Sequence, residues 1–343
     1  MEPFAVFLAR GGFSREVAAL GIRTEELPTG RVRHAARAAR SVARLRDLIA
    51  RERPAALLGF GAKAQVYLGP AAAAAGLGDH SAWWQNELPR RAVHRLATAL
   101  PATAIGCPSQ YLADEQARMR PRRPVFVVRP GIDPPPPPPP EEAAALRDRL
   151  GIPAGAPVVG MVGRLSPVKR HDLLLHALAR LRRRGVPAHG LIVGSDAHAL
   201  APRYALGVRA LANELGLGDA VTFTGQVADV RAHLAVMDVF VSAAAEEGFG
   251  IAVLEAMGQG VPVVAADAGG PREAVERDGT GLLVAPGDAD AIAGAAERLL
   301  ADGALRDRLG ARGREVVGER FTTARMIGEF HERLEQLAQG RVG

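Results

Sequence analysis

The chain has 343 residues, of which 48% are hydrophobic, and a formal net charge of +6 at pH 7. This length is enough for two domains with a core each, and no apolar run approaches the roughly 18 residues that a membrane span needs. Cys107 is the only cysteine, which excludes an intrachain disulfide and a cysteine-based metal cluster. The N-terminal stretch "MEPFAVFLARGG" is too short and wrongly flanked for a signal peptide, so we expect a cytoplasmic protein.

The positive charge is concentrated in the first part of the chain. Residues 1–133 hold 20 Lys+Arg against 11 Asp+Glu, whereas the remainder holds 23 against 26. A GC-rich genome would by itself favour arginine, but one segment stands out. In residues 30–53 a basic row and an apolar row follow the same 4-3-4 spacing. The basic row is Arg33, Arg37, Arg40 and Arg44. The apolar row is Ala38, Val42, Leu45 and Ile49. This predicts an amphipathic helix whose arginine stripe suits an anionic membrane or an acidic ligand, or simply faces solvent on the outside of an α/β domain.

The first half contains short β-rich runs at 4–9, 55–60, 80–85, 103–108 and 124–130. The second run continues as "LLGFGAKAQ", which fits the dinucleotide pattern G-x-G-x-x-A at Gly59, Gly61 and Ala64. The acidic residue that should end the following strand is missing, because Asp79 precedes that strand, so a nicotinamide dehydrogenase is disfavoured. No nucleic-acid reader motif accompanies the basic residues, and the histidines lack metal-ligand spacing.

Seven consecutive prolines, Pro134 to Pro140, divide the chain. Such a run predicts a stiff polyproline II spacer of roughly 20 Å, although proline runs also serve as ligands of peptide-recognition domains. Its position between two patterned halves favours the spacer. We therefore expect an N-terminal domain over 1–133, a linker over 134–141, a second domain over 142–320 and a C-terminal helical segment over 321–343.

The second half alternates apolar strands with amphipathic helices in a regular order. Strand candidates lie at 156–165, 189–196, 220–227, 238–244, 261–267 and 281–286, with helical stretches such as 169–185 and 203–216 between them. This alternation is typical of βαβ units and of a doubly wound parallel sheet covered on both faces. Two such domains facing each other would place the carboxyl ends of both sheets around one cleft, where these folds bind ligands.

The stretch "GMVGRLSPVKRHD" predicts an anion site at the end of a strand. Gly163 permits a tight turn, and Arg164 and Lys169 follow within six residues, before a helix that begins near His171. The pattern lacks the G-x-x-x-x-G-K-[ST] signature, so a P-loop is excluded. Two ordinary surface cations in a βα loop would leave the same local pattern.

The stretch "AEEGFGIAVLEAM" places two carboxylates around a glycine-rich turn. Gly248 and Gly250 permit close approach of the backbone to a ligand, and Glu247 could contact that ligand or cap the helix. Ile251, Leu254 and Gly258 mark the expected buried face of the following helix by their spacing.

Glu255 lies on the same expected face, four residues after Ile251. An ionised carboxylate there must find hydrogen-bond donors. A vicinal diol such as a ribose would supply two, and a structural partner such as Arg272 or the backbone could do so as well.

Taken in order, these motifs resemble a known family. "GRLSPVK", "EEGFGIAVLE" and "GVPVVAADAGGPREAVERDGTGLLVAPGD" are similar to glycosyltransferase family 4, whose members are retaining nucleotide-sugar transferases of the GT-B fold. The resemblance covers about 157–290 strongly and 101–133 less strongly, where "VVRPGID" resembles the crossing between domains. It implies two Rossmann-like domains facing a central cleft, with the last helix packing back on the N-terminal domain.

The resemblance also assigns roles to individual residues. Arg164 and Lys169 would hold the donor diphosphate in place of a metal ion, and Glu247 would face the donor sugar, these three forming the catalytic set. Glu255 would bind the ribose diol. The remaining donor-binding positions would be Gly163, Gly194, Val227, Gly248, Phe249, Gly250 and Ile251. The leaving phosphate would help deprotonate the acceptor, so neither an enzymic nucleophile nor a cofactor is implied, and UDP or GDP is the expected nucleotide.

Two departures from the family pattern concern the N-terminal domain. "ARGGFSREVAALGI" reaches its next glycine only nine residues after Gly12, too soon for the family's first four-turn helix, so the segment resembles the second βα unit of a shortened domain. Asn86 occupies the place where the family often has a histidine beside the donor sugar. Asparagine keeps hydrogen bonding but cannot act as an acid or a cation.

The expected function is transfer of a sugar from a nucleotide-diphosphate sugar to a glycan or lipid-linked acceptor, with peripheral contact between the arginine stripe and an anionic membrane at its inner face. Two alternatives stay open: a non-catalytic protein that binds a nucleotide sugar, and a GT-B epimerase or phosphorylase.

Overall fold

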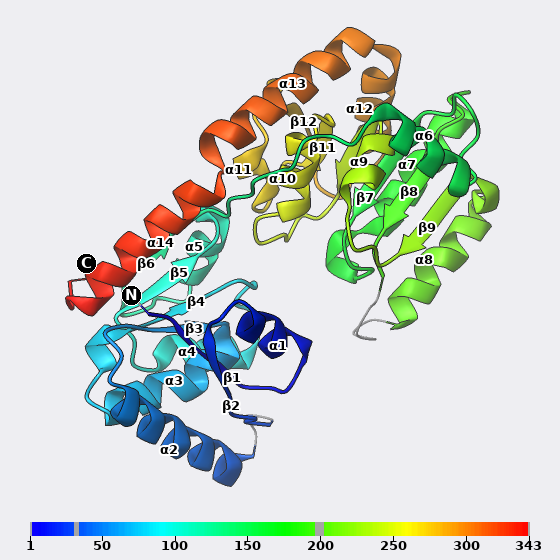
Figure 1. Cartoon of the computed structure of the whole chain (residues 1–343). Helices are drawn as coiled ribbons and strands as arrows, with labels where there is room; N and C mark the ends of the chain where they lie inside the picture. The colour runs from blue at the N-terminus through cyan, green and yellow to red at the C-terminus, as the bar shows by residue number, and fades with distance from the viewer. Residues whose placement is uncertain (1, 31–33, 196–201, 342–343) are drawn as a thin grey trace. The chain divides into compact units, whose positions relative to one another are not determined.

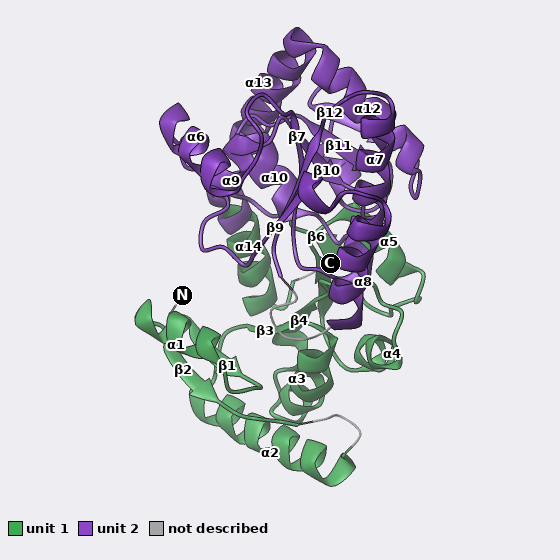
Figure 2. Cartoon of the chain, turned by 90° about the vertical axis from the view of Figure 1, so that its right-hand side faces the viewer, with its two compact units in different colours: residues 1–128, 328–343 green, residues 129–327 purple. Residues whose placement is uncertain are grey.

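The computed structural model describes residues 2–30, 34–195 and 202–341. The chain divides into two compact units: unit 1 comprises Met1–Val128 and Gly328–Gly343, and unit 2 comprises Arg129–Ile327 (Figure 2). Both units are built from parallel strands connected by helices (Figure 1).

Unit 2 contains one six-stranded parallel sheet. Its strands in spatial order are β12 (Gly281–Val284), β11 (Val263–Ala266), β10 (Val239–Ser242), β7 (Val158–Val162), β8 (His189–Val193) and β9 (Val221–Gly225). The chain enters at β7 in the middle, proceeds outward to β9 and then returns to β10 on the other side of β7. The direction of winding therefore reverses between β7 and β10, and the carboxyl ends of these two strands border the crevice where doubly wound sheets bind ligands.

Both faces of this sheet are covered, because alternate residues of each strand point to opposite sides. Val159 and Val241 belong to a buried cluster with helices α7 (His171–Arg183), α8 (Pro202–Glu214) and α12 (Ala289–Ala301). Val158 and Phe240 belong to a second cluster on the other face. The helices of that face are α6 (Pro140–Arg149), α9 (Arg231–Val236), α10 (Ile251–Gly258), α11 (Pro271–Ala274) and the second half of α13 (Gly303–Arg320), whose first half contributes Leu305 and Leu309 to the first cluster. All six strands predicted for this half are confirmed.

Unit 1 contains a four-stranded parallel sheet in the order β3 (Leu57–Phe60), β4 (Ser81–Trp84), β5 (Ala104–Cys107) and β6 (Val125–Val127). Trp83 and Ile105 pack on one face with helices α3 (Ala62–Ala74) and α4 (Ala92–Ala99). The remaining helices of the first 128 residues are α1 (Gly12–Ala19), α2 (Ala35–Glu52) and α5 (Gln110–Ala117). The five strands predicted for this half are confirmed.

The second strand of the chain, β2 (Arg23–Glu26), was not predicted. β1 (Phe4–Phe7) pairs in parallel with β2, a separate two-stranded sheet in which Phe4 lies opposite Arg23. The sequence "RTEE" has no apolar alternation, because this strand is only partly buried. Its polar side chains are held by neighbours instead: the Arg23 guanidinium lies 4.2 Å from the centre of the Phe4 ring and pairs with Glu52.

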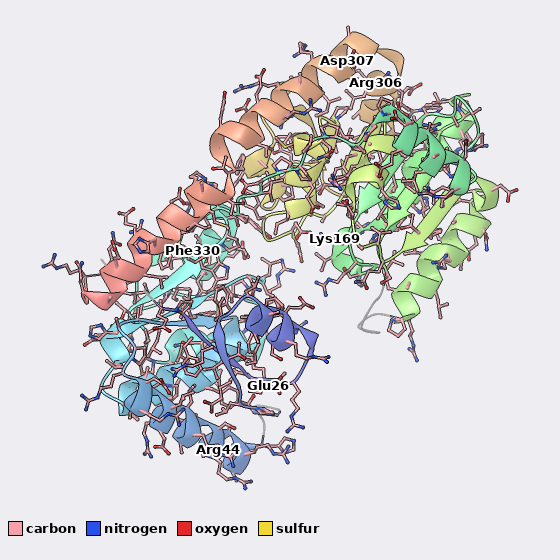
Figure 3. All side chains as sticks on the ribbon, viewed as in Figure 1. Glu26, Arg44, Lys169, Arg306, Asp307 and Phe330 are labelled. Carbon is pink, nitrogen blue, oxygen red and sulfur yellow. The ribbon has the colours of Figure 1, made fainter. Side chains whose placement is uncertain are left out.

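Helix α2 uses its apolar face inside unit 1. Leu45, Leu48 and Ile49 are buried in a cluster with Tyr67 and Leu68 of α3. Three members of the arginine stripe, Arg37, Arg40 and Arg44, are exposed, and Arg44 is labelled on α2 in Figure 3. Arg33 lies outside the described residues. The apolar row is thus committed to the core, and only the charged row is available to a partner.

The segment before α6 contacts unit 2, and the second half of the last helix contacts unit 1. The Ile132 amide donates to the Phe321 carbonyl at 2.7 Å, and the Gln259 side chain donates to the Pro135 carbonyl at 2.9 Å, so the start of the proline run lies on unit 2. Phe330 of α14 (Thr323–Ala338), labelled in Figure 3, packs on Trp84 with ring centres 4.8 Å apart. His80 Nδ1 lies 3.1 Å from the Leu337 carbonyl oxygen. The second half of α14 is therefore part of unit 1.

Candidate functional site

Two glycines bring the loops after β7 and β8 into contact. Gly163 and Gly194 have φ values of +151° and +134°, which favour glycine. A Cβ on Gly194 would lie 2.1 Å from the Gly163 carbonyl oxygen, so a larger residue does not fit there. The Gly163 amide donates to the Val193 carbonyl at 2.9 Å, and the Gly194 amide donates to the Gly225 carbonyl at the same distance. Gly163 and Gly194, both predicted site residues, thus lie next to each other at the carboxyl ends of β7 and β8.

Lys169 and Glu247 form an ion pair that connects the loops after β7 and β10. Lys169 ends the short 3₁₀ helix η2 (Pro167–Lys169), and its Nζ lies 2.5 Å from Glu247 Oε2. The two side chains are only 22% and 20% exposed. Figure 3 labels Lys169 on this loop of unit 2. The contact spans the strands between which the winding reverses, so two residues predicted independently from separate motifs meet at the expected ligand crevice.

The loop that carries Lys169 is fixed by buried and paired neighbours. The His171 amide donates to the Tyr204 hydroxyl at 3.0 Å, and Arg170 pairs with Asp172 at 2.9 Å. Burial, with a smaller contribution from Lys169, lowers the pKa of His171 to about 4. His171 is therefore neutral at neutral pH and adds no charge to the site.

The loop from Glu247 to Gly250 is held by a second glycine-rich loop. The Gly270 amide donates to the Glu247 carbonyl at 2.9 Å, and a Cβ on Gly270 would lie 2.3 Å from Phe249 Cα. Phe249 is buried against Phe321, with ring centres 5.8 Å apart, and Gly250 has a φ of +90°. Sequence analysis assigned no role to Gly270. The sequence feature that could have identified Gly270 is the "AGGP" that follows the strand at 263–266.

Helix α10 corrects one prediction about its buried face. Ile251 is 51% exposed rather than buried, because it is the first residue of the helix, directly after the loop that ends at Gly250. Val253 is buried in its place, together with Leu254, Ala256, Met257 and Gly258. The helix lies against the sheet and also against α13, so its covered surface is broader than a single stripe.

Glu255 is half-buried on α10. Among the described residues, no hydrogen bond or ion pair joins its carboxylate to another residue, and Arg272 instead approaches Asp267 at 3.7 Å. Burial raises the pKa of Glu255, nearby Asp229 raises it further and Lys169 opposes the rise. Asp229 was missed by sequence reasoning. The structure therefore excludes Arg272 as the partner and leaves the carboxylate able to accept hydrogen bonds from a ligand.

The other predicted site residues are placed as follows. Arg164 follows Gly163 and is exposed, and within the described ranges no carboxylate pairs with it. Gly248 lies half-buried in the loop after Glu247, and Val227 packs on the second cluster of unit 2, two residues beyond β9. Asn86 belongs to unit 1. It is exposed at the carboxyl end of β4, with its Oδ1 3.8 Å from the position of a Cβ on Gly61.

Over the described ranges, no group of three His, Cys, Asp or Glu side chains is arranged to hold a metal ion. Among those same residues, no helix has the length and apolarity required to cross a bilayer.

Comparison with known structures defines the fold class. HepE of Anabaena in complex with UDP-glucose matches with a TM-score of 0.84 and 23% identity, over 97% of this chain and 91% of that chain. Sucrose-phosphate synthase of Thermosynechococcus elongatus matches with a TM-score of 0.74 and 24% identity, over 98% and 99%. The chain has the GT-B fold, as predicted.

Comparison of sequences defines the family. The family model described as glycosyl transferases group 1 matches residues 142–316. A GDP-mannose-dependent alpha-(1-6)-phosphatidylinositol monomannoside mannosyltransferase of Mycolicibacterium smegmatis is 34% identical over 276 residues, covering 74% of this chain and 70% of that protein. The lipopolysaccharide core biosynthesis glycosyltransferase LpsE of Rhizobium meliloti is 38% identical over 176 residues, covering 51% and 49%. The chain belongs to the glycosyl transferases group 1 family, and it spans about half the length of several curated relatives that it matches.

Proposed function

We propose that this protein is a retaining glycosyltransferase of the family 4 type that transfers a sugar from a UDP- or GDP-linked donor. The observation that carries the proposal is the Lys169–Glu247 contact, which joins the loops after β7 and β10 at the crevice of the unit that the family model matches. Relatives and structural neighbours support both nucleotides, since the mycobacterial mannosyltransferase is GDP-mannose-dependent and HepE was crystallised with UDP-glucose.

The cations would bind the donor diphosphate. Arg164 is exposed without a carboxylate partner in the described residues, and Lys169 projects over the same β7 loop. Charge-assisted hydrogen bonds from these groups are worth about 1.5–3 kcal/mol each. They would stabilise the negative charge that develops on the departing nucleotide, so that transfer proceeds without a metal ion.

The carboxylates would bind the neutral parts of the donor. Glu255 can accept hydrogen bonds from a ribose diol, because it has no protein donor among the described residues. Glu247 would accept from hydroxyls of the donor sugar, beside the backbone of Gly248, Phe249 and Gly250. The chain supplies no side chain that we assign as a nucleophile. The acceptor oxygen would bond to the anomeric carbon on the face from which the donor phosphate departs, and that phosphate would take the proton of the acceptor hydroxyl, so the anomeric configuration is retained.

The acceptor is proposed to be a glycan or a lipid-linked sugar, bound by unit 1 on the cytoplasmic side of a membrane. The relatives named above act in lipopolysaccharide core biosynthesis and on a phosphatidylinositol monomannoside. The exposed arginines Arg37, Arg40 and Arg44 would contact anionic headgroups through charge alone, because the apolar row of α2 is buried. Vesicle binding that is unchanged when these three become glutamine would exclude this contact.

Calorimetric titration with UDP, GDP and ADP tests the donor site. The wild type should bind one of these nucleotides with micromolar affinity, and Lys169→Ala should weaken that binding at least tenfold. Arg298→Ala on α12 is the control, because Arg298 is an exposed cation of the same unit that pairs with Asp278. Binding followed by turnover of the matching nucleotide sugar supports the transferase. Binding without turnover of any sugar would support a non-catalytic protein, and no binding at all would refute the donor site.

A further inference from the structure

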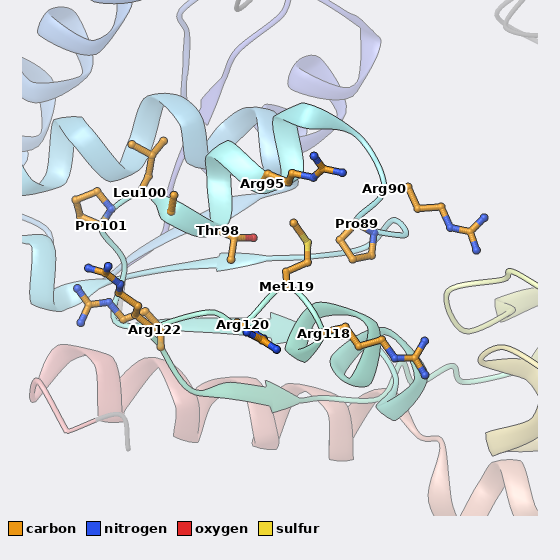
Figure 4. A pocket seen from close by; sticks show the side chains of 12 residues that line it. Pro89, Arg90, Arg95, Thr98, Leu100, Pro101, Arg118, Met119, Arg120 and Arg122 are labelled. Carbon is orange, nitrogen blue, oxygen red and sulfur yellow. The ribbon is translucent and has the colours of Figure 1, made fainter.

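Unit 1 contains a cavity of about 890 Å³ between α4 and the turn that follows α5 (Figure 4). Six arginines line it: Arg90, Arg95, Arg118, Arg120, Arg122 and Arg123. The residues that line it include no Asp or Glu and none of the residues of the proposed donor site. We call this cavity the arginine groove. Because it shares no residue with the donor site, its role does not rest on the function proposed above.

Four of the six arginines of the groove have no ion-pair partner among the described residues. Arg118 pairs with Glu115 on α5. By contrast, no carboxylate of the described residues forms an ion pair with the other four arginines, Arg95, Arg120, Arg122 and Arg123. Four guanidinium groups that share one concave surface repel one another, and an anion in the groove would relieve that repulsion.

Arg120 ends α5 in a backbone conformation that favours glycine. Arg120 has a φ of 52°, in the left-handed region, and its amide donates to the Ala117 carbonyl at 2.9 Å to end α5. Glycine or asparagine usually occupies this position after a helix, because a larger side chain is strained there. Here the strained residue is an arginine that lines the groove (Figure 4).

The groove is held in shape by hydrogen bonds beneath it. The buried Gln116 side chain donates to the Thr98 hydroxyl at 2.8 Å, and Thr98 donates to the His94 carbonyl at 2.8 Å. These bonds fix α4 against α5. The non-polar residues Leu100 and Met119 also line the groove, so uncharged parts of a ligand can pack between the arginines.

We propose that the arginine groove binds a soluble anionic ligand that carries at least two phosphate or carboxylate groups, such as an acidic oligosaccharide. Arginine is suited to both groups because its planar fork donates two parallel hydrogen bonds to one oxyanion. A single anion would neutralise only part of four unpaired cations. The volume also fits, since sites for small molecules measure about 300–1,000 Å³.

Calorimetric titration with tripolyphosphate tests this assignment. The titration uses the full chain carrying Arg164→Ala and Lys169→Ala, so that the proposed donor diphosphate site cannot contribute. It is done near 0.15 M salt, where long-range attraction is screened beyond about 8 Å. In this background the groove variant is Arg95→Gln, Arg120→Gln, Arg122→Gln. The control is Arg15→Gln, Arg46→Gln, Arg53→Gln, which removes the same charge from exposed positions of unit 1 outside the groove.

The groove variant should weaken tripolyphosphate binding at least tenfold, and the control should change it less than about threefold. Equal losses in both variants would show attraction to general positive charge and would overturn the proposal. So would inorganic phosphate that binds as tightly as tripolyphosphate. If the triple variant fails to fold, Arg122→Gln alone should still weaken binding severalfold. Phosphatidylglycerol vesicles form the last arm: vesicle binding that needs the groove, with no binding of tripolyphosphate, would assign the groove to a membrane and refute a soluble ligand.

Discussion

Replacing Glu247 by glutamine should tighten nucleotide binding while it impairs transfer. In the structure, Glu247 holds the ammonium of Lys169 at 2.5 Å, and this ammonium is proposed to bind the donor diphosphate. A phosphate that arrives must either displace the Glu247 carboxylate or bind beside it against its negative charge. Both arrangements oppose nucleotide binding. Glutamine keeps the shape of the side chain and removes the charge.

The structure gives the size of this effect. At 2.5 Å and an effective dielectric of 20, the attraction within the pair is about 6–7 kcal/mol before desolvation is counted. Because both side chains are only about one-fifth exposed, the net contribution is that of a charged hydrogen bond, about 1.5–3 kcal/mol. When that competition is removed, the Kd of the preferred nucleoside diphosphate should fall by about 10- to 100-fold. The rate of sugar transfer should decrease, since Glu247 is also proposed to accept hydrogen bonds from the sugar hydroxyls.

Calorimetry on wild type, Glu247→Gln and Glu297→Gln checks this prediction. Glu297 lies on α12, where it pairs with Arg184, so its substitution changes the net charge of unit 2 equally at a different place. Tighter binding in Glu247→Gln alone supports competition between Glu247 and phosphate. An unchanged or weaker affinity in Glu247→Gln would refute it, and an equal gain in the control would attribute the effect to overall charge.

Three further predictions concern other parts of the site. The pKa of Glu255 is raised in the folded state above its ordinary value of 4.5. Its contribution to stability is therefore fully present below pH 4.5 and is lost as the pH rises through the pKa of the folded state. Glu255→Gln, which cannot ionise, should raise the melting temperature at about pH 7 but not at about pH 4. The same variant should weaken nucleotide binding about 10- to 100-fold, and a gain in stability that is equal at both pH values would contradict the assignment. Gly194→Ala, whose Cβ would lie 2.1 Å from the Gly163 carbonyl oxygen, should lower the free energy of unfolding by about 2–4 kcal/mol in urea. Gly207→Ala, at an exposed position of α8 where no atom lies within 4 Å of the added Cβ, should instead raise the free energy of unfolding by up to about 1 kcal/mol. Similar losses of stability in the two glycine variants would refute the steric argument. Asn86→Ala should lower the transfer rate and leave the nucleotide Kd unchanged, since Asn86 belongs to unit 1; a weakened nucleotide Kd would place it in the nucleotide site.

Most of the sheet of unit 2 could be predicted because its strands are buried on both faces. A strand such as β11 is apolar at every position, and such a run indicates a buried strand wherever that strand lies in the sheet. β2 could not be predicted in this way. It is half-exposed and polar, and it is a strand only because β1 offers hydrogen bonds to it.

The amino-acid sequence by itself determined the fold class and the loops that carry the candidate site. Glycines at positive φ and charged residues at the ends of apolar strands are local features, so the positions of Gly163, Lys169 and Glu247 could be identified without coordinates. The pattern also located Glu255 on a covered helix, where a carboxylate demands an explanation.

Only the tertiary structure decided which of these residues meet. Lys169 and Glu247 are 78 residues apart in the chain, and their contact exists because β7 and β10 are neighbours in the sheet. The arginine groove likewise combines α4 with the turn after α5, and nothing in the local spacing of its arginines indicates a common surface. Burial and charge at a site are sums over neighbours in space. Local sequence therefore determines which groups are present, whereas the packing of the sheets and helices determines which of them act on the same ligand.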